Sequence, residues 1–403
     1  MVIGIIGAGA SGMAAALAAA ENENVQVVLF ERQTRVGRKL AATGNGRCNL
    51  TNLSANLQGY HGENPEFVLP ALQRYDVAAT LDWFHDLGLY TVAEDSGRVY
   101  PYSDQANSVV DILRFALDKP NIRLLSGFEV QKARKVDGVF RVQSDDEVVC
   151  CDKLIIACGG LAGSRLGGST AGYRLLREFG HKCTKLRPAL VQLKSSWGGC
   201  ASLKGVRANC CAQILCDGRL HSESMGELQF VDYGLSGPVI FEVSRDACFG
   251  KGNWICRMDF VPSMDMQILR AELMRRRNTG WNAEELLTGI LHNRLGRVLT
   301  QSVGIKGTWK IADLRDDEID AVCAAVKGFE AALLETMGMD AAQVTAGGII
   351  TADFDPETME SRLVQGLYAC GEVLDIDGDC GGFNLQWAWS SGRSAGAHAG
   401  GNL

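Results

Sequence analysis

The chain has 403 residues, and 40 lysine and arginine residues against 47 aspartate and glutamate residues give it a net charge of −7. This length predicts two or three domains, and the acidic balance argues against electrostatic attraction to nucleic acid or to anionic membranes. The 47 glycines and 8 prolines depart from average usage, which gives about 28 and 20. The 14 cysteines are scattered without a preceding secretory signal, so we expect a reducing, cytoplasmic protein.

The N-terminal segment predicts a strand, a glycine turn and a helix. Val2 to Ile6 is an apolar run typical of a buried parallel strand, GAGASG follows, and Ser11 to Ala20 favours a helix. A second strand is expected over Val25–Phe30, ending at Glu31. Val2 to Ala20 is nineteen residues without a charge, but its structured glycines and its two distinct halves favour this βαβ start over a membrane span.

The pattern alternates between strands and helices up to about Pro188 and then changes texture. In this first part we expect one further helix and three further strands, in the order Val109–Asp118, Ile122–Leu125, Glu129–Arg134 and Lys153–Ala157. From Ala189 to Phe260, short alternating segments separated by glycine turns predict an antiparallel β module; examples are Ala212–Cys216 and Trp254–Phe260.

Helices dominate the stretch that follows the β module, and an α/β pattern returns at the end of the chain. We expect helices across Met264–Ser302, with Ser263 as one cap and a capping box at Asn282 and Glu285. The basic run Arg275–Arg277 is interpreted as a solvated helix face. The remaining expected elements are a helix over Asp316–Lys327, strands over Glu330–Thr336 and Leu367–Cys370, and a helix from about Asn384 to His398. The first domain is therefore expected to be interrupted by the middle of the chain.

The glycines Gly7, Gly9 and Gly12 form a GxGxxG fingerprint between a strand and a helix, with the acidic Glu31 ending the next strand. This context indicates a dinucleotide site, because the three glycines permit a tight turn, close approach of a pyrophosphate and close helix packing. The amides at the helix start then bind the anion. Glu31 is suited to accept hydrogen bonds from the hydroxyls of an adenosine ribose.

A long loop, GRKLAATGNGRCNLTN from Gly37 to Asn52, distinguishes this chain from a plain nicotinamide dehydrogenase. It resembles the signature of a family of bacterial flavoproteins that contains aminoacetone oxidase and 3-dehydro-bile-acid Δ4,6-reductase. The resemblance continues in GRVYP (97–101), ACGGLAGSRLGGSTAGY (157–173), GELQFVDYGLSGPVIFEVS (226–244) and VTAGG (344–348). It is most specific in LYACGEVLDIDGDCGGFNLQWAWSSGRSAG (367–396).

The resemblance implies an α/β fold: an FAD-binding, Rossmann-like domain of the glutathione-reductase type with inserted β-barrel-like and small helical domains. The expected segments are 1–187 and 341–403 for the FAD-binding domain, 188–262 and 306–340 for the β insertion, and 263–305 for the helical insertion.

It also implies the residues that hold FAD. The pyrophosphate is expected to bind at Gly7, Gly9, Ala10, Ser11 and Gly12, and the adenosine at Glu31, Arg32, Val130 and Gly159. The flavin and its phosphates fall to Arg38, Lys39, Thr43, Gly44, Asn45, Gly46, Arg47 and Asn49. The ribityl chain and the pyrimidine edge fall to Gly371, Glu372, Asp379, Gly381, Gly382, Phe383, Asn384 and Leu385, where the helix beginning near Asn384 offers its positive end to flavin N1.

The catalytic residue is open, and four candidates stand out: Arg98, Tyr100, Asp232 and His61. Arg98 is suited to bind a carboxylate or polarise a carbonyl, and His61 follows the flavin loop. Asp232 stands where the family often has a histidine, and it needs a raised pKa to act as an acid at neutral pH. At least one of Trp387 and Trp389 is expected in the core, and a flavin-side role stays open for the other.

Other chemistries have less support. A disulfide reductase needs a cysteine partner four residues away in the flavin loop, and Cys48 lacks one, although a pairing with Cys380 stays open. The six histidines show no ligand spacing, so no metal is expected. A second GxGxxG after a strand is missing, so any NAD(P)H is expected to bind transiently over the flavin.

These observations predict an FAD-dependent oxidoreductase that uses NAD(P)H to deliver a hydride through flavin N5 to an activated, enone-type C=C bond of a small apolar substrate. One alternative is an amine or aminoketone oxidase that uses oxygen. Another is a flavin-carrying binding protein with little turnover. We expect no nucleic-acid or membrane partner.

Overall fold

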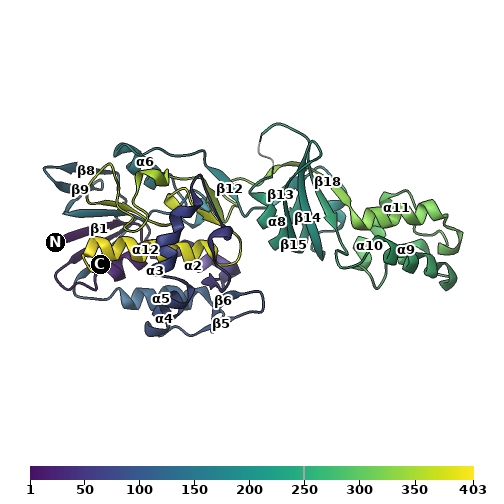
Figure 1. Ribbon diagram of the computed structural model, residues 1–403, viewed down its shortest axis with the longest axis horizontal. Helices are drawn as coiled ribbons and strands as arrows, with labels where there is room; N and C mark the ends of the chain where they lie inside the picture. The colour runs from purple at the N-terminus through teal and green to yellow at the C-terminus, as the bar shows by residue number, and fades with distance from the viewer. Residues whose placement is uncertain (248–249) are drawn as a thin grey trace. The chain divides into compact units, whose positions relative to one another are not determined.

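The computed structural model describes residues 1–247 and 250–403, which form two compact units (Figure 1). The first unit combines both ends of the chain, Met1–Pro188 and Gln343–Leu403, and the second is Ala189–Ala342. The finer division into five segments stays a prediction.

The first unit is built on a parallel sheet of five strands in the order β20-β11-β1-β2-β7. Every neighbouring pair in it runs parallel, so the carboxyl ends of all strands meet at one edge. The strands are β1 (Val2–Ile6), β2 (Gln26–Glu31), β7 (Ile122–Ser126), β11 (Lys153–Ile156) and β20 (Leu367–Ala369). The predicted α/β fold and the bounds of the first strand are confirmed, because short apolar runs buried on both faces identify such strands.

Helix α1 (Ala10–Ala19) packs against helix α12 (Phe383–Gly400) from the other end of the chain. A Cβ added at Gly392, Gly396 or Gly400 would lie 2.4, 2.2 or 2.9 Å from the backbone oxygen of the facing α1 residue. These glycines are four residues apart and form one stripe on α12, which faces Ser11, Ala15 and Ala19 on α1. The small residues therefore allow the two backbones to touch.

Across the described residues, no helix combines the length and apolarity that crossing a membrane requires.

Smaller elements accompany the parallel sheet in the first unit. They are the sheet β3 (Thr51–Asn52), β6 (Arg98–Pro101) and β5 (Thr91–Ala93), the pair β4 (Tyr60–His61) and β21 (Asp377–Gly378), and the helices α2 (Arg38–Ala42), α3 (Leu69–Arg74), α4 (Val77–Asp86), α5 (Ala106–Ala116) and α6 (Ala171–Glu178). The strand β12 (Arg187–Ala189) pairs with β19 (Val344–Ala346).

One predicted strand of the first unit is shifted. The strand expected over Glu129–Arg134 is β8 (Lys132–Val136), and it continues into an antiparallel sheet with β9 (Val139–Gln143) and β10 (Val148–Cys151). Asp137 and Gly138 have φ angles of 49° and 83°, which is the backbone that a two-residue hairpin needs. Val130 consequently precedes the strand and does not lie on it.

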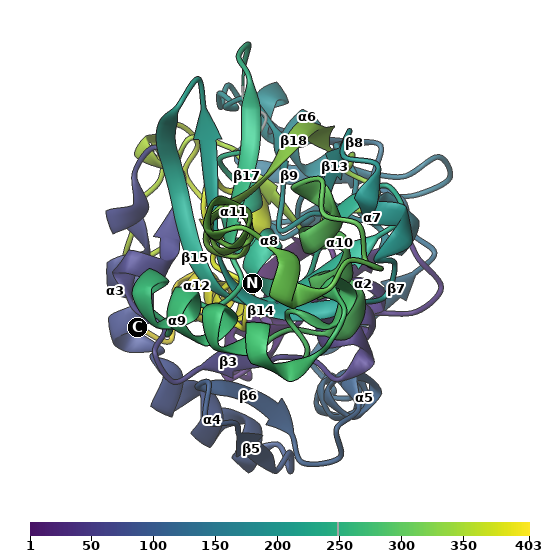
Figure 2. The same cartoon turned by 90° about the vertical axis from the view of Figure 1, so that its right-hand side faces the viewer.

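The second unit contains a closed barrel in the order β13-β16-β15-β14-β17-β18, whose long strands are prominent in Figure 2. Its strands are β13 (Leu193–Ser195), β14 (Arg207–Cys216), β15 (Arg219–Val231), β16 (Gly234–Ser236), β17 (Trp254–Asp259) and β18 (Phe329–Thr336). Its helices are α7 (Gly199–Ser202), α8 (Pro238–Ser244), α9 (Met266–Arg275), α10 (Asn293–Ser302) and α11 (Asp316–Lys327). The predicted β-barrel-like module and the bounds of α11 are confirmed.

In the helical part of this unit, the expected Ser263 cap is wrong, and the expected capping box is present but begins a different element. Asp265, and not Ser263, is the N-cap residue of α9, and the capping box of Asn282 and Glu285 begins a 3₁₀ turn over Ala283–Glu285 and not an α-helix.

The basic run is a solvated face only in part: the side chain of Arg275 is 71 % exposed, but Arg276 is 8 % exposed. Its guanidinium donates to the carbonyls of Leu286 and Thr288 at 2.8 and 2.7 Å and to Glu272 at 3.0 Å. The loop after α9 supplies carbonyls that local sequence does not reveal, and Arg276 is the residue that holds them.

Candidate active site

The fingerprint loop follows β1 and places its three glycines in three different surroundings. Gly7 has φ +106°, and a Cβ there would lie 2.5 Å from the carbonyl oxygen of Ala157. A Cβ on Gly12 would lie 1.8 Å from the carbonyl oxygen of Gly7, so helix and turn are in contact. A Cβ on Gly9 would meet no protein atom within 4 Å. The space beside Gly9 is open at the N-terminus of α1, where Ala10, Ser11 and Gly12 start the helix without an acidic side chain.

The residues predicted for the adenosine side lie near the ends of neighbouring strands. The carboxylate of Glu31, at the end of β2, accepts from the amides of Ala8 and Gln33 at 2.9 and 2.8 Å, which links it to the fingerprint turn. Arg32 donates to the carbonyl of Gly167 at 2.7 Å. Gly159, with φ +68°, follows β11, and the carbonyl of Val130 accepts from Arg174.

The predicted flavin loop has an unusual backbone. Gly44, Asn45, Gly46 and Cys48 all have positive φ angles, between 56° and 87°. The loop closes on itself, because the amide of Cys48 donates to the carbonyl of Thr43 at 3.0 Å. Such a conformation costs free energy in the two non-glycine residues and is found at ligand sites. The side-chain oxygen of Asn49 is buried without a hydrogen-bond partner, which fits a ligand that would donate to it.

Lys39, which precedes the flavin loop, joins it to a distant part of the chain. Lys39 on α2 forms an ion pair with Glu372 at 2.7 Å, and the other carboxylate oxygen of Glu372 accepts from the amide of Thr345 at 2.9 Å. Arg38 donates to Gln33 at 3.0 Å. A Cβ on Gly371 would lie 2.5 Å from the hydroxyl of Ser11, so the segment after β20 lies directly against the fingerprint helix.

The loop before α12 is organised around Asn384. Its amide donates to the carbonyl of Gly378 at 2.7 Å, and its side-chain oxygen accepts from the Gly378 amide at 2.8 Å. Gly381 and Gly382 have φ angles of 109° and 111°, and a Cβ on Gly382 would lie 2.4 Å from Thr51 of the flavin signature. Leu385 packs against the core, and Phe383 accepts through its carbonyl from the hydroxyl of Tyr60 at 3.1 Å.

The expectation that at least one of Trp387 and Trp389 lies in the core is confirmed for both, whereas the buried role of Gln386 was not predicted. Trp387 is 2 % exposed and Trp389 is 0 % exposed. Their indole N–H groups donate to the carbonyls of Gly371 and Leu50 at 3.2 and 2.9 Å, so both are core residues that anchor the two loops. Gln386 accepts from Thr51 at 2.6 Å and donates to Thr80 at 2.9 Å. The length of the C-terminal motif was a signal for this burial, because a helix that is buried on every side must fit its neighbours at every position.

The four catalytic candidates are in different settings. Arg98 and Tyr100 lie on β6, next to the loops just described. The imidazole of His61 is 2.7 Å from the carboxylate of Asp379. Asp232 belongs to the second unit, and a hydrogen bond from Lys204 at 2.8 Å lowers its pKa. Asp232 therefore carries no proton at neutral pH, the opposite of what a proton donor needs.

The described residues contain no group of three or more histidine, cysteine, aspartate or glutamate side chains placed to hold a metal ion. Cys48 and Cys380 are free thiols, and burial raises the pKa of Cys48 to about 12, so it is a poor nucleophile.

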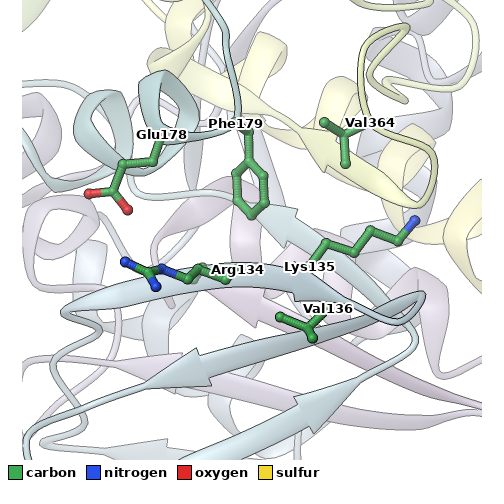
Figure 3. A pocket seen from close by; sticks show the side chains of 7 residues that line it. Arg134, Lys135, Val136, Glu178, Phe179 and Val364 are labelled. Atoms are coloured by element: carbon green, nitrogen blue, oxygen red, sulfur yellow. The ribbon is translucent and has the colours of Figure 1, made fainter.

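A groove of about 490 Å³ lies beside β8, where Phe179 and Val364 face Arg134, Lys135 and Val136 (Figure 3). Its lining contains none of the predicted cofactor residues.

These surroundings fit a dinucleotide whose pyrophosphate lies over Gly9. The fingerprint turn, the flavin loop and the Gly371 and Gly381 segments come together at the carboxyl edge of the sheet, where such ligands bind in open α/β sheets. The role of each residue toward the cofactor stays a prediction.

Comparison with known proteins gives the following matches. Residues 1–398 match the family described as HI0933-like protein Rossmann domain. The 3-dehydro-bile acid Δ(4,6)-reductase of Clostridium scindens is 38 % identical over 98 % of both chains. The ribosomal RNA dihydrouridine synthase of Escherichia coli is 31 % identical over 96 % of this chain and 95 % of that protein. The 3-ketosteroid Δ1-dehydrogenase of Sterolibacterium denitrificans, solved with 1,4-androstadiene-3,17-dione, has a TM-score of 0.50, 12 % identity, and coverage of 100 % and 99 %, which shows similarity of fold.

Proposed function

The chain belongs to the HI0933-like family and is an FAD-dependent oxidoreductase, and from that premise we propose that it uses NAD(P)H to saturate a C=C bond conjugated to a carbonyl group. The observation that carries the proposal is the end-to-end similarity to two enzymes whose names both describe the saturation of a C=C bond, a Δ(4,6)-reductase and a dihydrouridine synthase. In a 3-oxo-Δ4,6 steroid and in uracil alike, that double bond is conjugated to a carbonyl.

FAD, when bound, supplies a hydride from N5. The amides at the start of α1 would bind its pyrophosphate, and the open space beside Gly9 would admit the phosphates. The amides at the start of α12, together with the positive end of that helix, would stabilise negative charge on the pyrimidine edge. Lys39 balances the charge of Glu372 beside the cofactor. Because the chain has one dinucleotide fingerprint, NAD(P)H would bind transiently over the flavin and would not need a domain of its own.

We favour a small, largely apolar substrate. A second candidate is a uridine within RNA, which the similarity to the dihydrouridine synthase supports. The charge balance favours the small molecule, since the second unit carries 17 lysine and arginine residues against 19 acidic residues. Binding to RNA depends on clustered positive charge and weakens steeply with salt.

The test uses the purified, FAD-loaded protein without oxygen. NADH or NADPH is expected to bleach the flavin, and the reduced protein is then mixed with cyclohex-2-enone, with a 3-oxo-Δ4,6 bile acid, with a uridine-containing oligoribonucleotide, or with air. Reoxidation by an enone supports the proposal, and reoxidation by the oligoribonucleotide alone selects the second candidate. If neither nucleotide bleaches the flavin, the proposal fails. If aminoacetone bleaches the flavin and oxygen alone restores it quickly, the protein is an oxidase and the proposal also fails.

A further inference from the structure

The strand β6 presents a cation and a phenol to the two predicted flavin loops. β6 is the middle strand of the sheet β3-β6-β5. Side chains two residues apart on a strand point to the same face, so Arg98 and Tyr100 lie side by side. The same face meets Gly381 in one loop and Gly44 in the other, since a Cβ on either glycine would lie within 4 Å of Arg98 or Tyr100, respectively.

Arg98 is a half-buried guanidinium that faces the Gly381 loop. A Cβ on Gly381 would lie 2.9 Å from its Nε, so the absence of a side chain there makes room for the arginine. The guanidinium of Arg98 makes no hydrogen bond or ion pair within residues 1–247 and 250–403, whereas Arg47 nearby binds Glu94 at 3.0 Å and also Asp104. A partly buried cation without an anion is costly unless a ligand supplies the partner.

Tyr100 is held in one orientation by its neighbours. The residue is 6 % exposed, and the guanidinium carbon of Arg47 lies 3.9 Å from the centre of its ring. Arg47 is in turn fixed by Glu94 and Asp104, so it acts as a positioning residue for the ring. Burial, followed by the negative charge of Glu94, raises the pKa of Tyr100 despite the opposing charges of Arg98 and Arg47. The phenol therefore stays protonated at neutral pH.

We propose that Arg98 and Tyr100 are the residues that contact the substrate: Arg98 hydrogen-bonds its carbonyl oxygen, and Tyr100 donates a proton to the carbon next to that carbonyl. The inference rests on the proposed function. Adding two hydrogens to the C=C bond takes a hydride at the β carbon, which the reduced cofactor supplies, and a proton at the α carbon. The O–H bond of Tyr100 breaks as the α C–H bond forms, and water returns a proton to the phenolate.

The charge that develops during this reaction makes the pair suitable. Hydride addition to the β carbon places negative charge on the carbonyl oxygen, and a guanidinium fixed beside that oxygen stabilises the charge. Of the other candidates, His61 is held by Asp379, and Asp232 carries no proton to give.

The central experiment separates the two half-reactions in Tyr100→Phe. The variant keeps the ring under Arg47 and removes only the hydroxyl. Bleaching of the flavin by NAD(P)H is expected to stay within about twofold of wild type, and reoxidation by an enone is expected to slow by roughly 10²–10⁴-fold, the usual contribution of a positioned acid. Tyr102→Phe is the matched control, because Tyr102 is 76 % exposed two residues further on, and it should behave as wild type.

A binding measurement tests Arg98 without turnover. Cyclohexanone, which has the carbonyl but no double bond, is titrated into the oxidised holoprotein, and the shift of the flavin absorbance reports binding. Arg98→Ala should weaken binding by about tenfold or more, which corresponds to about 1.4 kcal/mol. Arg98→Lys should recover part of it, and Tyr100→Phe should change it by less than about threefold.

The outcomes distinguish this inference from the proposed function. If the wild-type flavin is reoxidised by neither the enones nor the oligoribonucleotide, the proposed function fails. If wild type reacts but Tyr100→Phe reacts equally fast, or if His61→Gln and not Tyr100→Phe slows reoxidation, the assignment of the donor is overturned while the function stands. Equal cyclohexanone binding in Arg98→Ala and wild type overturns the role of Arg98.

Discussion

The open space beside Gly9 leads to the prediction that Gly9→Ala weakens FAD binding without weakening the fold. The added methyl group meets no protein atom within 4 Å, and φ of Gly9 is −82°, which alanine adopts without strain. Alanine is a poorer N-cap residue than glycine by roughly 0.5 kcal/mol. It also reduces the conformational entropy of the unfolded chain, which stabilises the folded protein by about 0.4–1 kcal/mol and offsets that loss. The free energy of unfolding of the apoprotein should therefore change by less than about 0.5 kcal/mol.

The same methyl group falls in the space that we propose for the pyrophosphate. Forcing a methyl into a filled space costs about 1–3 kcal/mol, so the Kd for FAD should rise by about 5–150-fold. Flavin fluorescence titration measures the Kd, and urea unfolding of the apoprotein measures stability.

Two further glycines serve as controls. In Gly12→Ala the methyl would lie 1.8 Å from the Gly7 carbonyl oxygen, so the apoprotein itself should lose about 1–3 kcal/mol. Gly198 is also an N-cap residue with open space around it, in the second unit, and Gly198→Ala should change neither quantity. Unchanged FAD affinity in Gly9→Ala, or a stability loss as large as that in Gly12→Ala, would refute the reasoning.

Three other predictions concern packing and charge. Gly396→Ala should destabilise the apoprotein by about 1–3 kcal/mol in urea unfolding, because its Cβ would lie 2.2 Å from the carbonyl oxygen of Ala15; a change below about 0.5 kcal/mol would mean that the two helices separate easily. Hydrogen bonds from Arg275 and Arg276 lower the pKa of Glu272 to about 2. The stability that this carboxylate contributes is therefore complete above its ordinary pKa of about 4.5 and is lost as the pH falls towards 2. Glu272→Gln should abolish that part of the pH dependence of the free energy of unfolding, and an unchanged acid transition would contradict this prediction. The raised pKa of Tyr100 predicts that enone reoxidation slows only above the ordinary tyrosine range, about pH 10, and that Tyr100→Phe lacks this decline; a decline near neutral pH would point to a different donor.

The β1-α1-β2 start was predictable because its signals are local. A buried parallel strand is an apolar run, and the spacing of Gly7, Gly9 and Gly12 is dictated by a turn and a helix that follow at once. The hairpin at Asp137 and Gly138 carried an equally local signal, the Asp-Gly pair, which the strand prediction overlooked.

Features that depend on partners far along the chain were out of reach of such patterns. Gly396 must be glycine because of Ala15, some 380 residues earlier in the sequence, and Arg276 is buried because a later loop offers it two carbonyls. In the candidate site, motifs predicted the cofactor residues, but the approach of Arg98 to Gly381 appears only when the chain is folded. The sequence suggested Arg98 and Tyr100 as catalytic candidates, and the structure places them on one face of β6.

The claim that the protein reduces conjugated C=C bonds is tested most directly by stopped-flow reoxidation of the NAD(P)H-reduced protein without oxygen. An enone or a uridine-containing oligoribonucleotide is expected to restore the oxidised flavin spectrum after rapid mixing, and one molecule of saturated product is expected for each flavin that is reoxidised. Reduced flavin that reacts with none of these compounds, yet reacts rapidly with oxygen, would contradict it.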